Sequence, residues 1–196
     1  MLDDFLAHMQ HGIYHVVNVN AYDHILFLIV LTLPYLFKDW KRVLLLVTIF
    51  VLGHTISLAL ATYDVISVSH KWIAFLIPMT ILVIALYNIF TAGKKTQNEK
   101  GGILFFATLF FGLIHGLGFV NTFESNINAS QNKLISLLEF SVGLEIGQLI
   151  IVFIIMFIGF LCQTLFRFSK RDWVMVISAI VIGMIIPVLI KNNIFG

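Results

Sequence analysis

Ionisable residues interrupt stretches of this sequence that are otherwise apolar enough to lie in a lipid bilayer. Asp23-His24, His54 and His115 are the clearest examples, and Glu145 lies in a fourth such stretch. Charged or titratable groups at such depth are costly, so they usually take part in function. Neutral imidazole is a good ligand for nickel, cobalt, zinc and copper, and a carboxylate neutralises a divalent cation in a low-dielectric setting. These residue types therefore predict a transition-metal site.

A second group of polar residues precedes the first apolar stretch. Asp4, His8, His11 and His15 recur at intervals of four, three and four, which stacks them on one face of a helix over residues 3–17. We interpret this helix as amphipathic, with His8 and His11 on a wet interfacial face. His15 is the exception that we assign to the metal site, with His11 as a secondary candidate.

Three further polar residues lie inside apolar stretches and are secondary candidates. Gln148 follows Glu145 by one helical turn, and Ser57 flanks His54, where it could support a metal ligand or bond to its own helix. Asn88 could stabilise helix packing or serve an inward path. His70 lies beside Lys71 in a loop, so we expect it to be exposed to solvent.

The composition shows which elements must position these residues. Of 196 residues, 60% are hydrophobic and 11% are charged, which excludes a soluble globule. We expect an all-α, polytopic membrane helix bundle with about six transmembrane helices and an N-terminal amphipathic interfacial helix. Residues 1–196 would form one membrane domain, with the interfacial helix over 1–20 and spans over about 21–37, 43–63, 72–92, 102–120, 138–162 and 173–190.

Basic residues alternate between the expected loops. The first, third and fifth loops hold Lys38, Lys41, Arg42, Lys94, Lys95, Lys100, Arg167, Lys170 and Arg171, against Lys71, Lys133 and Lys191 elsewhere. The positive-inside rule then predicts that both termini lie outside the cytoplasm. Nothing suggests a nucleic-acid surface. The start of the chain lacks the basic region of a signal peptide, and the single cysteine, Cys162, excludes a disulfide within one chain.

This topology gives the ionisable residues a common depth. His24, His54 and His115 lie about 12 to 14 residues from the inner ends of their spans, roughly 18 to 21 Å above the cytoplasmic edge. Glu145 descends from the outside to near the midplane. A lone intramembrane histidine can simply hydrogen-bond across helices, but three histidines and two acids at matched depth favour a shared site.

The same residues carry a resemblance to a known family. The segments are GIYH (12–15), DHILFL (23–28), FVLGHTISL (50–58), FGLIHGLGF (111–119) and LEFSVGLEIGQ (138–148). Together they resemble the successive signatures of the HupE/UreJ family. The resemblance implies a bacterial inner-membrane protein of six or seven helices, often encoded with nickel hydrogenase or urease genes and regarded as a nickel or cobalt permease. The family's metal-site residues would carry over to His15, Asp23, His24, His54, His115 and Glu145.

Two positions depart from the family pattern. Relatives often have Asn where this chain has Ser141, and Glu in the third span where this chain has Ala74. Many relatives also carry an N-terminal extracytoplasmic segment that this sequence does not show. If that Glu binds metal or relays protons, the site here is altered.

Several functions fit a histidine and carboxylate site. We favour a transporter of a divalent transition metal over an enzyme, with the lipid bilayer and the metal ion as partners. The alternatives are a zinc-dependent intramembrane hydrolase or transferase acting on lipid, in which Asp23 or Ser57 would orient or deprotonate the water, and a metal sensor or accessory subunit. Ligand softness does not separate nickel, cobalt and zinc. The sequence is compatible with a protein partner or with a homo-oligomer.

Overall fold

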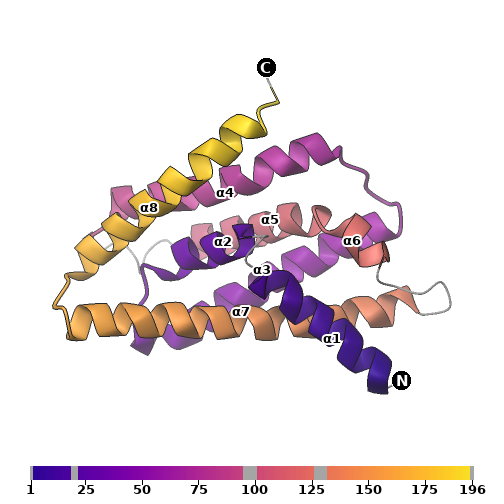
Figure 1. The fold of residues 1–196 in the computed structure, drawn as a ribbon, viewed down its shortest axis with the longest axis horizontal. Helices are drawn as coiled ribbons and strands as arrows, with labels where there is room; N and C mark the ends of the chain where they lie inside the picture. Colours follow the sequence, from indigo (N-terminus) through magenta and orange to yellow (C-terminus); the bar gives the residue numbers. More distant parts are fainter. Residues whose placement is uncertain (1, 19–21, 95–100, 126–131, 195–196) are drawn as a thin grey trace.

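Helices make up the computed structural model, which describes residues 2–18, 22–94, 101–125 and 132–194. No strand occurs within these ranges, so the predicted all-α class is confirmed. Figure 1 shows the arrangement of the helices. In chain order they are α1 (Leu2–Val17), α2 (Asp23–Thr32), the 3-10 turn η2 (Phe37–Asp39), α3 (Trp40–Thr62), α4 (His70–Thr91), α5 (Gly101–Leu117), α6 (Val120–Ser125), α7 (Lys133–Thr164) and α8 (Lys170–Lys191).

The long helices have the length and composition of membrane spans. Four stretches qualify in the described part of the chain, namely Phe37–Thr62, His70–Thr91, Lys133–Thr164 and Lys170–Lys191. Asp23–Thr32 and Leu104–Leu117 are apolar but shorter. The protein is therefore a multi-pass membrane protein, and the count of about six spans stays a prediction.

α2 is shorter than the span that the sequence suggests for residues 21–37. It has 10 residues, which at about 1.5 Å per residue cover roughly half of a bilayer core. It ends at Thr32, two residues before Pro34, which has no backbone N–H to continue the helix, although Leu33 still has helical torsion angles. The start of the expected span, residue 21, lies outside the described residues, as do Lys95 and Lys100.

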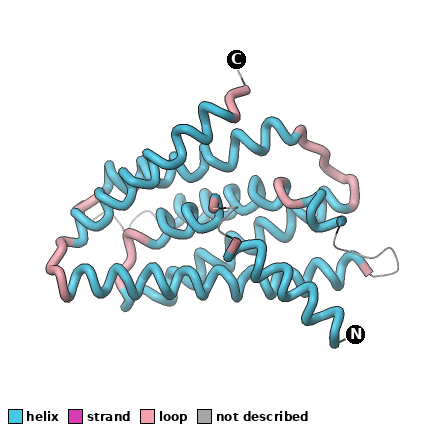
Figure 2. The backbone as a smooth tube through the Cα atoms, viewed as in Figure 1, coloured by secondary structure: helices cyan, strands magenta, loops and turns pink. Residues whose placement is uncertain are grey.

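The helices pack in pairs around the short α2. α3 lies against α5, α1 against α7, and α4 against α8, while α2 contacts α4, α7 and α8. Figure 1 shows α2 in the middle of the bundle and α1 crossing α7 obliquely. Figure 2 shows the α2–α3 and α7–α8 loops at one end and the α3–α4 loop at the other. The bundle therefore has two distinct ends, and the first and fifth basic loops share one of them.

Glycines bring two of these pairs into backbone contact. A Cβ at Gly116 would meet the carbonyl oxygen of His54 on α3, and a Cβ at Gly12 would meet the carbonyl oxygen of Phe140 on α7. Small residues permit such close approach of helices in membranes. α1 is thus packed on α7, and its expected location at the membrane interface stays a prediction. Both contacts lie one turn or less from a histidine of the candidate site.

Candidate metal centre

Four histidines from four helices meet inside the bundle. His15 lies on α1, His24 on α2, His54 on α3 and His115 on α5. One ligand nitrogen from each of His15, His24 and His54 lies within 4.8 Å of the other two. The His115 ring is next to them, with its centroid 5.2 Å from that of His24. Residues that are remote in sequence therefore converge on one small volume.

Most nitrogens of this cluster are buried and lack a protein partner. His24, His54 and His115 are 3%, 0% and 1% exposed. Leaving a buried polar atom without a partner costs free energy, so such atoms usually mark an interaction with something else. The cluster nitrogens with no hydrogen-bond partner in the described part of the chain are His15 Nε2, His24 Nε2, His54 Nδ1, His54 Nε2 and His115 Nδ1. Imidazole lone pairs gathered in this way fit a metal ion.

Hydrogen bonds assign the tautomers of two of these histidines. Thr80 Oγ1 donates its only proton to the Ile77 carbonyl at 2.7 Å, so it accepts from His115 Nε2 at 3.2 Å. His24 Nδ1 lies 3.3 Å from Asp23 Oδ1 and donates to it. The lone pairs of His115 Nδ1 and His24 Nε2 are then left for a metal. Such bonds from the second nitrogen orient a ligand and raise its basicity.

Aromatic rings enclose the cluster. The His15 ring lies 3.8 Å from the Phe119 ring, and the His115 ring lies 5.2 Å from Phe50 and 5.3 Å from Phe27, between centroids. Apolar walls exclude water and strengthen electrostatic interactions inside them. A divalent cation in this setting needs a nearby negative charge, and Asp23 is the carboxylate that contacts the cluster.

Asp23 also reaches a cavity that leads away from the cluster. Its side chain is 32% exposed. The cavity has a volume of about 250 Å³ and lies between α2, α4 and α8, where Ala74, Pro78 and Asn192 line it. Asn192 Nδ2 donates to the Ala74 carbonyl oxygen at 2.9 Å across its wall. One carboxylate thus joins an open cavity to the buried histidines.

Glu145 and Gln148 are not in the group of three histidines. Thr48 Oγ1 of α3 donates to Glu145 Oε1 at 2.7 Å, which engages one oxygen of this half-buried carboxylate. Gln148 is 0% exposed, and both its side-chain polar atoms lack a partner in the described residues. The sequence groups Glu145 with the metal ligands, whereas the structure gives it a contact of its own between α3 and α7.

The remaining candidates have separate roles in the structure. Ser57 Oγ donates to the His54 carbonyl at 3.1 Å, and Asn88 Nδ2 donates to the Val30 carbonyl at 2.6 Å. His11 is exposed. His8, expected on a wet face, is instead 6% exposed and bonds Glu139 of α7 at 2.7 Å. Ser141, at the first departure from the family, bonds Thr55 Oγ1 at 2.7 Å.

Sequence reasoning missed the two threonines that support this region, Thr48 and Thr80. Each lies in an apolar span, where a threonine often bonds only to its own helix. The signal that could have identified Thr80 is its place inside α4 two residues after Pro78, at a depth similar to that of the histidines.

Comparison with known proteins agrees with these motifs. No curated protein and no solved structure matches the chain. A family model described as HupE / UreJ protein matches residues 1–192, which is nearly the whole chain. The chain belongs to the HupE/UreJ family.

Proposed function

We propose that this protein transports a divalent transition-metal cation, Ni²⁺ or Co²⁺, and that the histidine cluster binds the cation in transit. The observation that carries the proposal is the set of buried, unpartnered nitrogens that four helices direct to one place. His15, His24 and His54 would be ligands, His115 a fourth, and Asp23 the source of negative charge. Membership of the HupE/UreJ family supports the same function.

The cavity beside Asp23 supplies a path of access to the cluster. A cation in the cavity between α2, α4 and α8 meets the exposed edge of the Asp23 carboxylate first. His24 is the next residue and hydrogen-bonds Asp23. Glu145 and the unpartnered Gln148 would serve the inward step. Binding must be exchangeable, since an ion that cannot leave blocks conduction.

The membrane in this proposal is a bacterial inner membrane with both termini outside the cytoplasm. The first and fifth loops, which hold Lys38 and Arg167, lie at one end of the bundle, as the positive-inside rule requires of cytoplasmic loops. The cation would therefore enter from the extracytoplasmic side, where the α3–α4 loop lies.

The enzymatic alternative has less support from the site. Ser57, which would orient a water, donates its hydroxyl to the His54 carbonyl instead. Asp23 is bonded to the ring and to the backbone nitrogen of His24, at 3.3 and 3.0 Å. Both polar groups are thus engaged in holding the helix and the ligand, which suits a binding site better than a hydrolytic one.

Uptake of Co²⁺ and Ni²⁺ into liposomes loaded with a metal-sensitive dye tests the proposal. The purified protein should produce a metal-driven signal that His54→Ala and His24→Ala abolish. His70→Ala is the matched control because His70 is exposed at the start of α4, away from the cluster, and should behave as the wild type. Size-exclusion profiles would verify that each variant is folded.

Titration calorimetry on the same preparations separates the competing functions. Tight Co²⁺ binding at the cluster without any uptake would contradict transport and indicate a sensor or accessory role. Turnover of lipid by the metal-loaded protein would replace the transporter by the hydrolase. Uptake that His54→Ala and His24→Ala leave intact would show that the cluster is not the transport site.

A further inference from the structure

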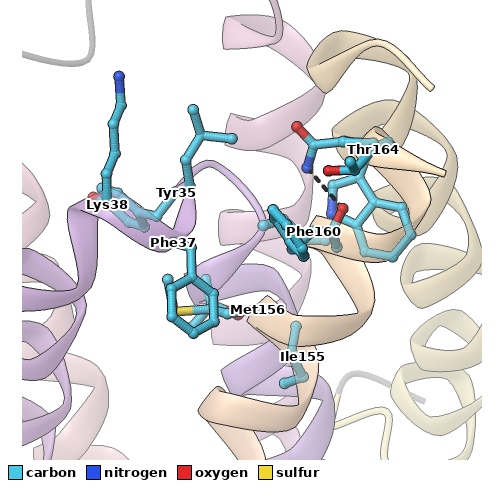
Figure 3. Close-up of a pocket in the computed structure, with 13 residues that line it drawn as sticks. Tyr35, Phe37, Lys38, Ile155, Met156, Phe160 and Thr164 are labelled. Carbon is cyan, nitrogen blue, oxygen red and sulfur yellow. Dashed lines mark hydrogen bonds between the residues drawn. The ribbon is translucent and has the colours of Figure 1, made fainter. Parts of the chain in front are cut away.

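A second cavity lies at the opposite end of α2, away from the histidines. It has a volume of about 280 Å³ and is bounded by the α2–α3 connection, the last turns of α7 and the start of α8. Figure 3 shows the Phe37 ring beside Met156, Phe160 between Phe37 and Thr164, and Lys38 extending away from these side chains. Gln163 and Thr164 add polar groups to its wall. The cavity is therefore apolar at its base and polar at its rim.

An apolar groove continues from this cavity along the bundle. The groove has a volume of about 520 Å³, runs between α3 and α7, and shares Phe37 and Met156 with the cavity. Leu44 and Val152 are among its walls. The Phe37 ring lies at the junction, 6.0 Å from the Phe153 ring and 6.4 Å from the Phe160 ring between centroids. A ligand that fills both spaces must have a polar end and a long apolar part.

Positive charge gathers around the polar end. Lys38 lines the cavity, is exposed, and makes no ion pair with any residue in the described ranges. Lys170 lies close enough to interact electrostatically with Lys38 and Asp39. Arg42 follows in the first turn of α3, over the ring of Tyr35, which lines the cavity. Lys41 lies over the Trp40 ring and lines neither the cavity nor the groove. The charge is complementary to an anion and unfavourable for a metal cation leaving by this route.

Trp40 marks the level of the membrane surface at this end of the bundle. Phe37, Trp40 and Phe160 are 43%, 53% and 49% exposed at this end of the bundle. Trp side chains concentrate at the headgroup level because the ring is apolar and its N–H is hydrated, whereas Phe37 and Phe160 offer purely apolar surface to the lipid. The polar rim of the cavity then lies among the headgroups, and the groove lies in the hydrocarbon region.

We propose that this cavity and groove bind one anionic phospholipid. Its phosphate lies at Lys38, its glycerol region contacts Gln163 and Thr164, and one acyl chain follows the groove past Leu44. Basic pockets between helices on the cytoplasmic side bind lipid headgroups by the same electrostatics. A soluble phosphate would use the rim but leave the apolar groove unfilled.

Native mass spectrometry of the purified full-length protein tests this site. Phosphatidylglycerol and phosphatidylcholine with identical chains are titrated separately, and glycerol 3-phosphate serves as a headgroup without chains. Phosphatidylglycerol should bind the more tightly of the two lipids. Lys38→Gln should weaken its binding about fivefold, from a contribution of about 1 kcal/mol per basic residue near the surface. Lys41→Gln removes the same charge from outside the cavity and should change binding little.

A second pair of variants tests the groove. Leu44→Trp should fill it and weaken binding of both lipids, whereas Leu45→Trp changes an exposed neighbour on α3 that does not line it and should have no effect. Equal losses in Lys38→Gln and Lys41→Gln would overturn the proposal in favour of diffuse charge attraction. The proposal would also be overturned if the two lipids bound with equal affinity or if Leu44→Trp left lipid binding unchanged. Binding of glycerol 3-phosphate as tight as that of phosphatidylglycerol would overturn it as well.

Discussion

Thr80 determines which nitrogen of His115 faces the histidine cluster. Its hydroxyl accepts from His115 Nε2 while donating to the Ile77 carbonyl. Thr80→Val keeps the shape of the side chain but removes the acceptor, so His115 loses the bond that leaves its Nδ1 lone pair for the metal. Loss of such a supporting bond weakens metal affinity about 10- to 100-fold. Thr80→Ser retains the hydroxyl and should restore most of the affinity for Co²⁺ measured by calorimetry. Equal affinities of Thr80→Val and wild type would contradict the supporting role of Thr80.

Ala74 offers a gain-of-charge test of the cavity beside Asp23. Because Ala74 lines the same cavity, Ala74→Glu adds a second carboxylate to the proposed access path. The half-saturating Co²⁺ concentration for uptake into liposomes should then fall severalfold at low ionic strength. Ala74→Gln has nearly the same shape without the charge and should resemble the wild type. A reduced half-saturating concentration in both variants would exclude an electrostatic cause.

The sequence predicts which residues could bind a metal better than it predicts which other residues each of them contacts. His24, His54 and His115 are conspicuous because an ionisable group in an apolar span is costly, and counting residues along a helix gives its depth. Depth does not give the direction in which a side chain points around the helix axis. Glu145 illustrates this limit: we expected it with the histidines, and it instead bonds Thr48 between α3 and α7.

At the scale of elements, the contact between α1 and α7 positions His15. Gly12→Ala would place a methyl group against the Phe140 carbonyl and push α1 away from α7, three residues before His15. We expect a folded protein whose Co²⁺ affinity falls at least tenfold. Gly183→Ala on α8 is the matched control, because nothing lies within 4 Å of the added Cβ. It should leave affinity unchanged and stabilise its helix by about 0.5 to 1 kcal/mol.

The long helices follow from the sequence because an apolar run of about 20 residues has few alternatives in a bilayer. The short elements do not. Hydropathy alone predicts one span over residues 21–37, whereas α2 ends at Thr32, two residues before Pro34. The pattern of α1 predicts an amphipathic helix with His8 and His11 on a solvated face. In the structure that face includes a partly buried bond from His8 to Glu139 of α7, which only tertiary packing could reveal.

At the scale of the whole molecule, the orientation in the membrane can be tested with two matched positions. Val65 in the α3–α4 loop and Phe166 in the α7–α8 loop are both 66% exposed. Each is changed to Cys after Cys162→Ala removes the only native thiol. A membrane-impermeant maleimide should label Val65→Cys in intact cells and Phe166→Cys only after permeabilisation. The reverse pattern would place the histidine cluster on the cytoplasmic side and turn the proposed uptake into export.

The affinity of the histidine cluster for metal should depend on pH. Protons and metal compete for the same imidazole lone pairs, so binding releases protons and weakens as pH falls. Each histidine that is protonated in the metal-free protein contributes up to about a tenfold loss of affinity per pH unit. Co²⁺ affinity in detergent, measured from pH 8 to pH 5 at constant ionic strength, should therefore decrease towards acid, and the slope counts the protonated ligands.

Exposed histidines could imitate this decrease, so the measurement needs its own control. His11 and His70 are exposed and lie outside the cluster. The double variant His11→Ala/His70→Ala should retain both the affinity and the slope, because neither residue belongs to the histidine cluster. A slope that disappears in the double variant would assign the proton competition to the surface. Affinity that stays constant from pH 8 to pH 5 would contradict proton competition at the cluster, and is the result expected if burial keeps the metal-free imidazoles neutral over this range.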